Sequence, residues 1–254
     1  CEVGRNRLRK ADRKEYILQL LQDSLSRNQV GLRLSSIVDT VTHKTNGIEF
    51  TLGLKGLSNE PINKKEFLPV AIKNNILTDL DLKALSKVCD FYKNYMDSTL
   101  KPNGIKHLSL TMSVTSVLNP AFLQAIQKIS ASEIMPKNFL VIAVDSKQII
   151  GNEEELKKVI AAAKAFGVFF SVHSFDPNID FSEKIKGLGF TYVRITRQIL
   201  ESAMASQSAN ASFIRMAADF DEKGLIAVVN HVTNQEQAQF CLDLAMPYYV
   251  DGDK

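Results

Sequence analysis

A chain of 254 residues, of which 45% are hydrophobic and 23% charged, can bury a full core in one large α/β domain or two small ones. Its formal net charge of +3 gives no indication of a nucleic acid or an anionic membrane as partner. Three scattered cysteines without a CxxC pair argue against a disulfide framework and a cysteine-based zinc site. No apolar run approaches the roughly 18 to 20 residues of a membrane span. We therefore expect a cytoplasmic protein or, because the chain begins with Cys1, the cytoplasmic part of a longer membrane-anchored one.

A basic segment opens the chain. Arg5–Lys14 contains six Lys or Arg residues in ten and leads into a helical pattern, in which Ile17, Leu21 and Leu25 share one face. We interpret residues 1–13 as a linker and first helical turn. Contact of this basic run with phosphate or RNA is the alternative.

The rest of the chain reads as one hairpin followed by alternating helices and strands. Residues 31–40 and 48–56 are strand-like, and the short link between them contains Asn46-Gly47, which predicts two antiparallel strands. The alternation that follows requires right-handed parallel crossovers. Eight strands in this order favour an α/β fold, a (β/α)8 TIM-like barrel whose first strand is antiparallel. The later strands are expected at 107–114, 139–145, 168–172, 192–196, 225–232 and 248–250, and the helices at 66–76, 79–96, 120–130, 153–166, 182–188, 210–223 and 235–245.

The strand expected at 168–172 delivers His173 and Ser174 to its carboxyl end, where barrels of this type carry their chemistry. A metal site that cleaves phosphodiesters would require carboxylates there, because hard divalent cations prefer anionic oxygen ligands. An imidazole and a hydroxyl are present instead. This strand end therefore does not predict such a site.

Eight segments occur in the same order and spacing as in one known family. They are SSIVD from Ser35, GIEFTLGL from Gly47, EFLPVAIKNNIL from Glu66, LSLTMSVTSVLNPAFL from Leu108, VDS from Val144, GVFFSVHSF from Gly167, YVRITRQIL from Tyr192 and NHVTNQEQA from Asn230. Through them, residues 14–254 resemble the EAL domain, the bacterial family that hydrolyses cyclic di-GMP (c-di-GMP). Gly4-Arg5-Asn6-Arg7 also resembles the end of a GGDEF diguanylate-cyclase domain. We therefore expect residues 1–13 to follow such a domain in a tandem signalling protein.

At the positions that bind metal in the EAL family, this chain departs from the pattern. The signature Glu is kept as Glu49, but a single carboxylate cannot hold two cations about 3.5 to 4 Å apart. The resemblance therefore implies a degenerate domain with no catalytic residue, no bound metal and no cofactor. The vestigial positions are Glu49, Thr111 (Asn in the family), Ile142 and Asp145 (both Glu), His173 and Ser174 (both Asp), Arg194 (Lys) and Asn230 (Glu).

The positions that bind the dinucleotide in the family are altered too. Ser35-Ser36 replace Gln-Pro and Gly53 replaces a phosphate-contacting Arg, while Asp251-Gly252-Asp253 place an acidic pair where it would repel a dianion. We therefore expect c-di-GMP binding to be disfavoured, although it remains an alternative. If the dinucleotide binds, two side chains are candidates for phosphate contacts and two for base stacking. These candidates are Arg194 and Arg197 for phosphate, and Phe50 and Tyr249 for stacking.

Structural explanations compete with functional ones at these positions. Glu49, His173 and His231 could be combined into a zinc site. However, His231 follows Asn230 on a strand, so the two side chains point to opposite faces. We expect His173 to fill the site of a lost cation and Asp145 to cap the following helical turn. Glu49 is then a relic paired with Arg194, and its replacement by Gln should change stability by less than about 0.5 kcal/mol.

Three functional hypotheses follow. The first is a catalytically inactive EAL domain that acts as a regulatory module and binds another protein in c-di-GMP-type signalling. The second is a c-di-GMP receptor of the LapD kind that signals through a partner protein without hydrolysing the dinucleotide. The third, an active phosphodiesterase, ranks below both. An RNA-turnover regulator of the CsrD kind is a further, lower-ranked alternative, and nucleic acid is not otherwise expected as a partner. A homodimer is one candidate for the oligomeric state.

Overall fold

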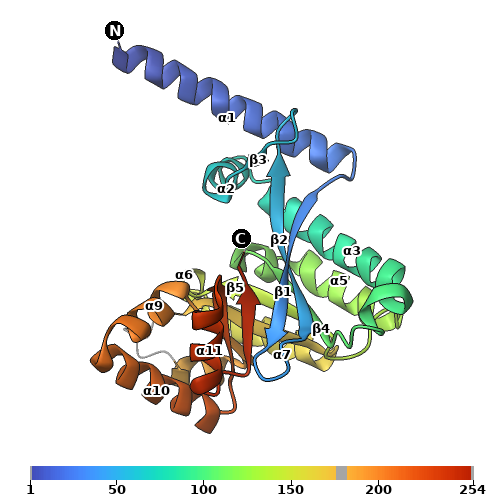
Figure 1. The fold of residues 1–254 in the computed structure, drawn as a ribbon. Coiled ribbons are helices and arrows are strands. Elements are labelled where there is room, and N and C mark those ends of the chain that lie inside the picture. The colour runs from blue at the N-terminus through green and yellow to red at the C-terminus, as the bar shows by residue number, and fades with distance from the viewer. Residues whose placement is uncertain (1, 176–181, 253–254) are drawn as a thin grey trace.

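The computed structural model of the chain describes residues 2–175 and 182–252. Eight strands form a closed barrel, in the order β1-β9-β8-β7-β6-β5-β4-β2, and β1 pairs with β2 to close the ring (Figure 1). The first strand is antiparallel to both of its neighbours, and the remaining pairs around the ring are parallel, which confirms the predicted barrel. The barrel strands are β1 (Gly31–Asp39), β2 (Thr45–Lys55), β4 (His107–Thr111), β5 (Leu140–Asp145), β6 (Val168–Phe175), β7 (Tyr192–Ile195), β8 (Ile226–Val232) and β9 (Tyr248–Asp251).

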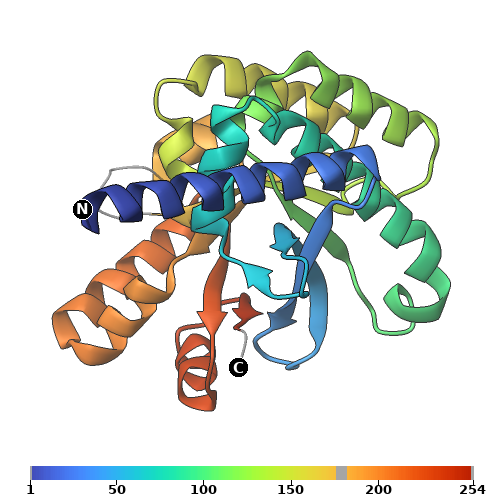
Figure 2. The same ribbon diagram turned by 90° about the horizontal axis from the view of Figure 1, so that it is seen from above.

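Helices surround the barrel, and a short strand, β3 (Pro61–Ile62), pairs with the far end of β2. Figure 2, seen from above, shows this ring of helices and α1 crossing over α2. The helix expected at 120–130 begins as predicted, because Asn119 accepts a hydrogen bond from the Ala121 backbone and Pro120 occupies the first turn. The helices are α1 (Glu2–Ser26), α2 (Lys64–Lys73), α3 (Leu77–Tyr95), the π-helical turn η1 (Met96–Leu100), α4 (Val114–Leu118), α5 (Pro120–Ala131), α6 (Ser146–Ile149), α7 (Glu153–Ala165), α8 (Ser182–Leu188), α9 (Arg197–Ala205), α10 (Gln207–Glu222) and α11 (Gln235–Asp243).

The first helix is longer than predicted. It runs without a break from Glu2 to Ser26, so the basic run that we interpreted as a linker is helical. Arg, Lys, Leu, Ala and Glu are all good helix formers, and after Gly4 there is neither Gly nor Pro to end the helix. The proposed domain boundary at residue 13 stays a prediction, because α1 passes through it. None of the described helices is both long and apolar enough to cross a membrane.

The main hydrophobic core lies between the strands and the helices. Ile142 and Phe170 are fully buried in it, and the Phe170 ring makes edge-to-face contacts with Phe122 and Phe190, at centroid distances of 6.3 Å each. A separate small cluster around Ile37, Val228 and Val250 is formed by the opposite faces of the strands. Alternation of side chains along each strand thus separates an outer core from the barrel interior.

Aromatic rings close the amino-terminal end of the barrel. His107, at the start of β4, stacks on Tyr192 at 5.7 Å and contacts the edge of Tyr248 at 6.4 Å. The facing position on β2 is Gly47, where an added Cβ would lie 2.5 Å from His107 Nε2. Burial, reinforced by Arg194, lowers the pKa of His107 to about 4, so its ring is neutral at pH 7.

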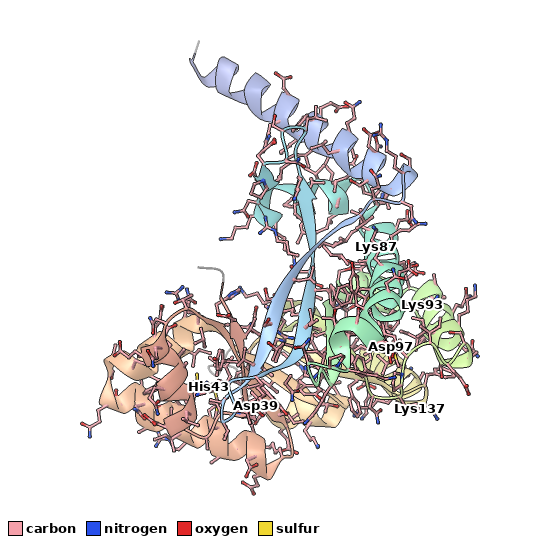
Figure 3. The ribbon with its side chains drawn as sticks, turned by 45° about the vertical axis from the view of Figure 1, so that its right-hand side comes forward. Asp39, His43, Lys87, Lys93, Asp97 and Lys137 are labelled. Carbon is pink, nitrogen blue, oxygen red and sulfur yellow. The ribbon has the colours of Figure 1, made fainter. Side chains whose placement is uncertain are left out.

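The turn of the β1–β2 hairpin lies at this same end, away from α1 and α2. Figure 3 labels Asp39 and His43 there. Asp39 Oδ1 accepts hydrogen bonds from the backbone of Val41 (3.1 Å) and Thr42 (2.8 Å), which fixes the turn. These bonds, Thr42 first, hold the pKa of Asp39 below its usual value.

Candidate functional site

A buried ion pair spans the barrel interior near the carboxyl ends of the strands. Arg194 Nη1, on β7, lies 2.8 Å from Glu49 Oε2 on β2, and its Nη2 donates to Ser109 Oγ on β4 at 3.0 Å. The Arg194 and Glu49 residues are only 2% and 6% exposed. Burial alone would raise the pKa of Glu49, but the Arg194 guanidinium holds it below its usual value. Glu49 is therefore a buried carboxylate with a fixed countercharge. Its pairing with Arg194 was expected from the sequence, but its burial was not.

His173 is a neutral member of the same site. Its Nε2 lies 3.8 Å from Glu49 Oε1 and 3.5 Å from Asn230 Nδ2, and its Nδ1 lies 2.9 Å from Ser174 Oγ. Burial first, and then Arg194, lowers the pKa of His173 to about 4. Because the imidazole is uncharged at pH 7, its approach to Glu49 is a dipolar contact and adds no positive charge.

The zinc alternative is wrong for His231. This residue is exposed and has a positive φ of 56°, whereas the neighbouring Asn230 is buried and faces His173. Within residues 2–175 and 182–252, no three His, Cys, Asp or Glu side chains are grouped so that they could hold a metal ion. The side chains around Glu49 do not fit a pair of divalent cations either, because its carboxylate already neutralises a guanidinium and its neighbours Thr111 and Asn230 are uncharged.

Asp145 and Ser174 shape the mouth through the backbone. Asp145 Oδ1 accepts a hydrogen bond from the Lys147 backbone at 2.9 Å and caps α6, which confirms the predicted capping role. Ser146 Oγ donates to the Ser174 carbonyl at 2.8 Å. Ser174 has a positive φ of 60° at an irregularity in the β6–β7 pairing. The carboxyl end of β6 is thus bent where it presents His173.

Three of the predicted site residues do not reach the mouth. Ile142 is on the strand face opposite to Asp145, in the outer core. Phe50 is 1% exposed and packs edge-to-face against Phe91 at 5.1 Å, so it cannot stack on a base. Tyr249 packs against the same outer core. Because side chains alternate along a strand, residue 50 must point outward once Glu49 points inward, and this rule would have excluded Phe50 from the sequence alone.

The predicted phosphate ligands are engaged with carboxylates. Arg194 is buried against Glu49, which corrects its assignment as a phosphate contact. Arg197 is half-exposed on α9, and its Nε lies 2.6 Å from Glu201 Oε1. Of the acidic pair expected to repel a dianion, Asp251 is exposed on β9, and Asp253 lies outside the described residues.

Two basic residues near the mouth were missed. Arg33 faces Thr51 in the β1–β2 ribbon, on the same face of β2 as Glu49, and its Cγ lies 3.0 Å from the position that a Cβ at Gly53 would take. Lys64 begins α2, and burial lowers its pKa although the carboxylates of Asp81, Glu49 and Asp145 oppose this shift. The hairpin register pairs Arg33 with Thr51, two residues before Gly53 on the same face of β2, so cross-strand neighbours were the signal available for Arg33.

Several buried polar atoms of the site have no hydrogen-bond partner among the described residues. They belong to the ion pair and to the side chains beside it, and Lys64 is a further cation that interacts electrostatically with Glu49. Since buried polar groups are normally satisfied, the site retains capacity to bind water or a small polar group. These atoms are Glu49 Oε1, Arg194 Nε, Thr111 Oγ1 and Asn230 Oδ1.

The architecture defines a (β/α)8 barrel with a reversed first strand and a polar carboxyl end centred on one glutamate. The EAL domain family profile matches residues 18–250, and the chain belongs to the EAL domain family. A comparison with curated protein sequences gave no match.

Solved structures share this fold at low sequence identity. The FimX EAL domain of Pseudomonas aeruginosa bound to c-di-GMP is 14% identical, with a TM-score of 0.81 over 92% of this chain and 93% of that one. The PaMucR phosphodiesterase in complex with c-di-GMP is 16% identical, with a TM-score of 0.82 over 92% and 94%. Vibrio cholerae LapD, an S helix-GGDEF-EAL protein bound to c-di-GMP, is 13% identical, with a TM-score of 0.78 over 94% of this chain and 56% of that one. These similarities establish the fold.

Proposed function

We propose that this EAL domain does not hydrolyse c-di-GMP and acts as a regulatory module that binds another protein. The observation that carries the proposal is the ion pair between Glu49 and Arg194, 2.8 Å apart. The guanidinium already neutralises the one signature glutamate, and no group of three His, Cys, Asp or Glu side chains among the described residues could hold a divalent cation beside it. A two-metal mechanism requires several anionic ligands at one mouth.

Hydrolysis of c-di-GMP in Mg²⁺ and Mn²⁺ tests the first part of this proposal. We expect no product above that of a heat-denatured sample, with PaMucR phosphodiesterase assayed in parallel as the active control. Turnover above that background, lost in Glu49→Gln, would refute the proposal.

Binding of c-di-GMP without hydrolysis is the second candidate, and one observation favours it. Gly53 stands where the EAL family has a phosphate-contacting arginine. The Arg33 side chain, from the neighbouring strand, lies against this position. An exposed guanidinium there can form charge-assisted bonds to a phosphodiester. The missing arginine is therefore a weaker reason against binding than the sequence suggested, whereas Asp251 remains exposed on β9.

Calorimetric titration with c-di-GMP separates the two candidates. A Kd in the low micromolar range that is lost in Arg33→Ala and restored in Arg33→Ala/Gly53→Arg would move the receptor function to first place. Arg197→Ala is the matched control, because Arg197 is already paired with Glu201. No saturable binding below about 100 μM, roughly −5.5 kcal/mol, would leave the protein-binding module as the function.

The tandem GGDEF-EAL context and the cytoplasmic location remain part of this proposal. The Gly4-Arg5-Asn6-Arg7 segment and the fold similarity to LapD, of which this chain spans about half, support the tandem arrangement. Sequencing the gene upstream of the codon for Cys1 tests it, and an upstream sequence without a GGDEF domain would overturn it.

A further inference from the structure

A groove between α1 and α2 lies apart from the barrel site. It has a volume of about 740 Å³ and runs along the part of α1 that crosses α2 in Figures 1 and 2. Its apolar floor is formed by Ile17 and Leu18 from α1 and by Pro69 and Val70 from α2. Ile17 and Val70 are buried, whereas Leu18 is only partly covered. The neighbouring Ile72 on α2 is 56% exposed, which extends the apolar surface beyond the groove.

The rim of the groove is predominantly basic. Arg13 and Glu66 neutralise each other across it, with Arg13 Nε 3.2 Å from Glu66 Oε2. Of the other charged lining residues, Lys14, Lys65 and Lys73 are cationic and one, Glu15, is anionic. Among the side chains that the structure describes, none forms an ion pair with these three lysines. The rim therefore has an unneutralised positive charge.

The amino-acid sequence extends this charge along the same helix. Before Ala11, α1 carries four more basic residues, and Glu2 is its only acidic residue there. The four residues are Arg5, Arg7, Arg9 and Lys10.

The shape and chemistry favour a protein helix over nucleic acid. Single-stranded nucleic acid is held by aromatic side chains on which bases stack, and no aromatic residue lines the described groove. An apolar floor between two helices is the surface that receives the apolar face of a third helix. Lys65 and Lys73 are about two helical turns apart, roughly 12 Å, which matches carboxylates at positions i and i+7 of a helix lying alongside.

We propose that the α1–α2 groove binds an acidic amphipathic helix of a partner protein. This inference rests on the proposed protein-binding function and identifies the surface and the partner chemistry for it. Leucine side chains of the partner would cover Leu18, Pro69 and Val70, and its flanking carboxylates would pair with Lys65 and Lys73 on the rim.

A designed peptide tests the groove directly. The probe is a fluorescein-labelled helical peptide of about 15 residues, with leucines on one face and glutamates at i and i+7 on its flank. A charge-reversed peptide with lysines in place of the glutamates is its matched control. By fluorescence anisotropy we expect saturable binding of the acidic peptide only, and weaker binding as salt is raised.

Charge reversal on the protein locates the binding surface. Lys65→Glu/Lys73→Glu should weaken peptide binding at least about tenfold. Lys157→Glu/Lys158→Glu makes the same change on exposed residues of α7 and should leave binding unchanged. Circular dichroism melts of both variants show that they are folded. Equal losses in the two variants, equal binding of both peptides, or no saturation up to about 1 mM would overturn the inference.

Two further arms separate the alternatives. Tighter binding to a single-stranded RNA oligonucleotide or to phosphatidylglycerol vesicles than to the acidic peptide, lost in Lys65→Glu/Lys73→Glu, would assign the groove to that ligand and overturn the helix proposal. The same preparations are assayed for c-di-GMP hydrolysis. Hydrolysis would refute the proposed function whatever the peptide result, whereas absent peptide binding without hydrolysis would refute only the groove.

Discussion

The two ends of this barrel are built from different chemistry. At the amino-terminal end, the neutral ring of His107 stacks on Tyr192, meets Tyr248 edge-to-face and lies against Gly47. At the carboxyl end, charged and polar side chains meet around Arg194 and Glu49, and several of their atoms lack partners within the described residues. The same strands run through both ends, so the difference lies in the side chains and not in the sheet.

This contrast shows which end tolerates change. A stack of rings is stabilised by contact area and packing, which any loss of shape reduces. In a buried ion pair each charge compensates the other. The fold loses stability when one partner is removed, because the remaining charge is then buried without a countercharge. We therefore expect the carboxyl end to respond to charge and the amino-terminal end to respond to volume.

Removal of Arg194 should have the largest effect. Arg194→Ala leaves the Glu49 carboxylate buried without its countercharge, and we expect a loss of about 3 to 5 kcal/mol of unfolding free energy in urea denaturation. Arg197→Ala, on an exposed pair, should stay within about 0.5 kcal/mol. Similar small losses in both variants would mean that the ion pair does not hold the mouth together.

Glu49→Gln sharpens the same point. The sequence-based expectation, a change in unfolding free energy below about 0.5 kcal/mol, assumed that the Glu49 carboxylate is exposed. Glu49 is only 6% exposed, so this assumption is wrong. The amide keeps the shape but leaves Arg194 uncompensated, so we now expect a loss in the range of Arg194→Ala rather than near zero.

Acidification should weaken both ends through histidine. The folded-state pKa values of His107 and His173 are about 4, below the usual 6.5, so the unfolded chain binds more protons than the folded one between these values. Stability should therefore be full above pH 6.5 and fall as the pH drops toward 4. Between pH 7.5 and 5 we expect a loss of about 2 kcal/mol from His107, and less from His173, whose side chain is 24% exposed.

Variants assign this pH dependence. His107→Phe keeps a ring against Tyr192 and should flatten the loss measured by urea denaturation at pH 5 and 7.5. His43→Gln, in the exposed hairpin turn, should leave it unchanged. An unaltered pH profile in His107→Phe would show that its burial does not control the effect.

A methyl group at Gly47 should disturb the amino-terminal end. The added Cβ would lie between 2.5 and 2.8 Å from three atoms of the His107 ring, and the ring is confined by Tyr192 and Tyr248. We expect Gly47→Ala to cost about 1 to 3 kcal/mol in a urea melt. Recovery in Gly47→Ala/His107→Ser would identify the clash, and no recovery would place the strain elsewhere.

The smallest effect is expected at Gly53. There an added Cβ would lie 3.0 Å from Arg33 Cγ and 3.6 Å from the Arg33 backbone nitrogen. The second distance is an ordinary contact, and the exposed Arg33 side chain can move away from the first. Gly53→Ala should remain within about 0.5 kcal/mol of the parent chain. A loss as large as that of Gly47→Ala would mean that Arg33 is rigidly held and that the ribbon is as tightly packed as the barrel end.

The fold could be predicted from the sequence because its signals are local. Asn119 before Pro120 and the apolar strands each act over a few residues. The expected Asn46-Gly47 link gave the hairpin but not its turn, because both residues lie inside β2 and the chain turns between Asp39 and Lys44. The α9 helix (Arg197–Ala205) was not predicted. A single residue separates it from β7 and a single residue separates it from α10, so its helical pattern could not be told apart from those of its neighbours. The start of α1 was missed because a run of charges was taken as a sign of a linker.

The candidate site was predictable only in part. The meeting of Glu49 with Arg194 was expected, but its depth was not, since burial depends on the packing of all eight strands around it. The alternation of side chains along a strand was not applied to three residues. Phe50, Tyr249 and Ile142 were therefore expected at the mouth, although their side chains point into the outer core. Lys64 reaches the site from another element, α2, and no spacing within the sequence indicates this.

The ion pair between Arg194 and Glu49 also bears on how such a domain evolves. A lineage that regained an acidic metal ligand beside Glu49 would first have to lose Arg194, and that step alone removes about 3 to 5 kcal/mol from a fold whose total stability is typically about 5 to 15 kcal/mol. A single replacement of Arg194 would therefore use up a large share of the fold's stability. Any change of charge at this mouth has to be made on both partners of the pair together.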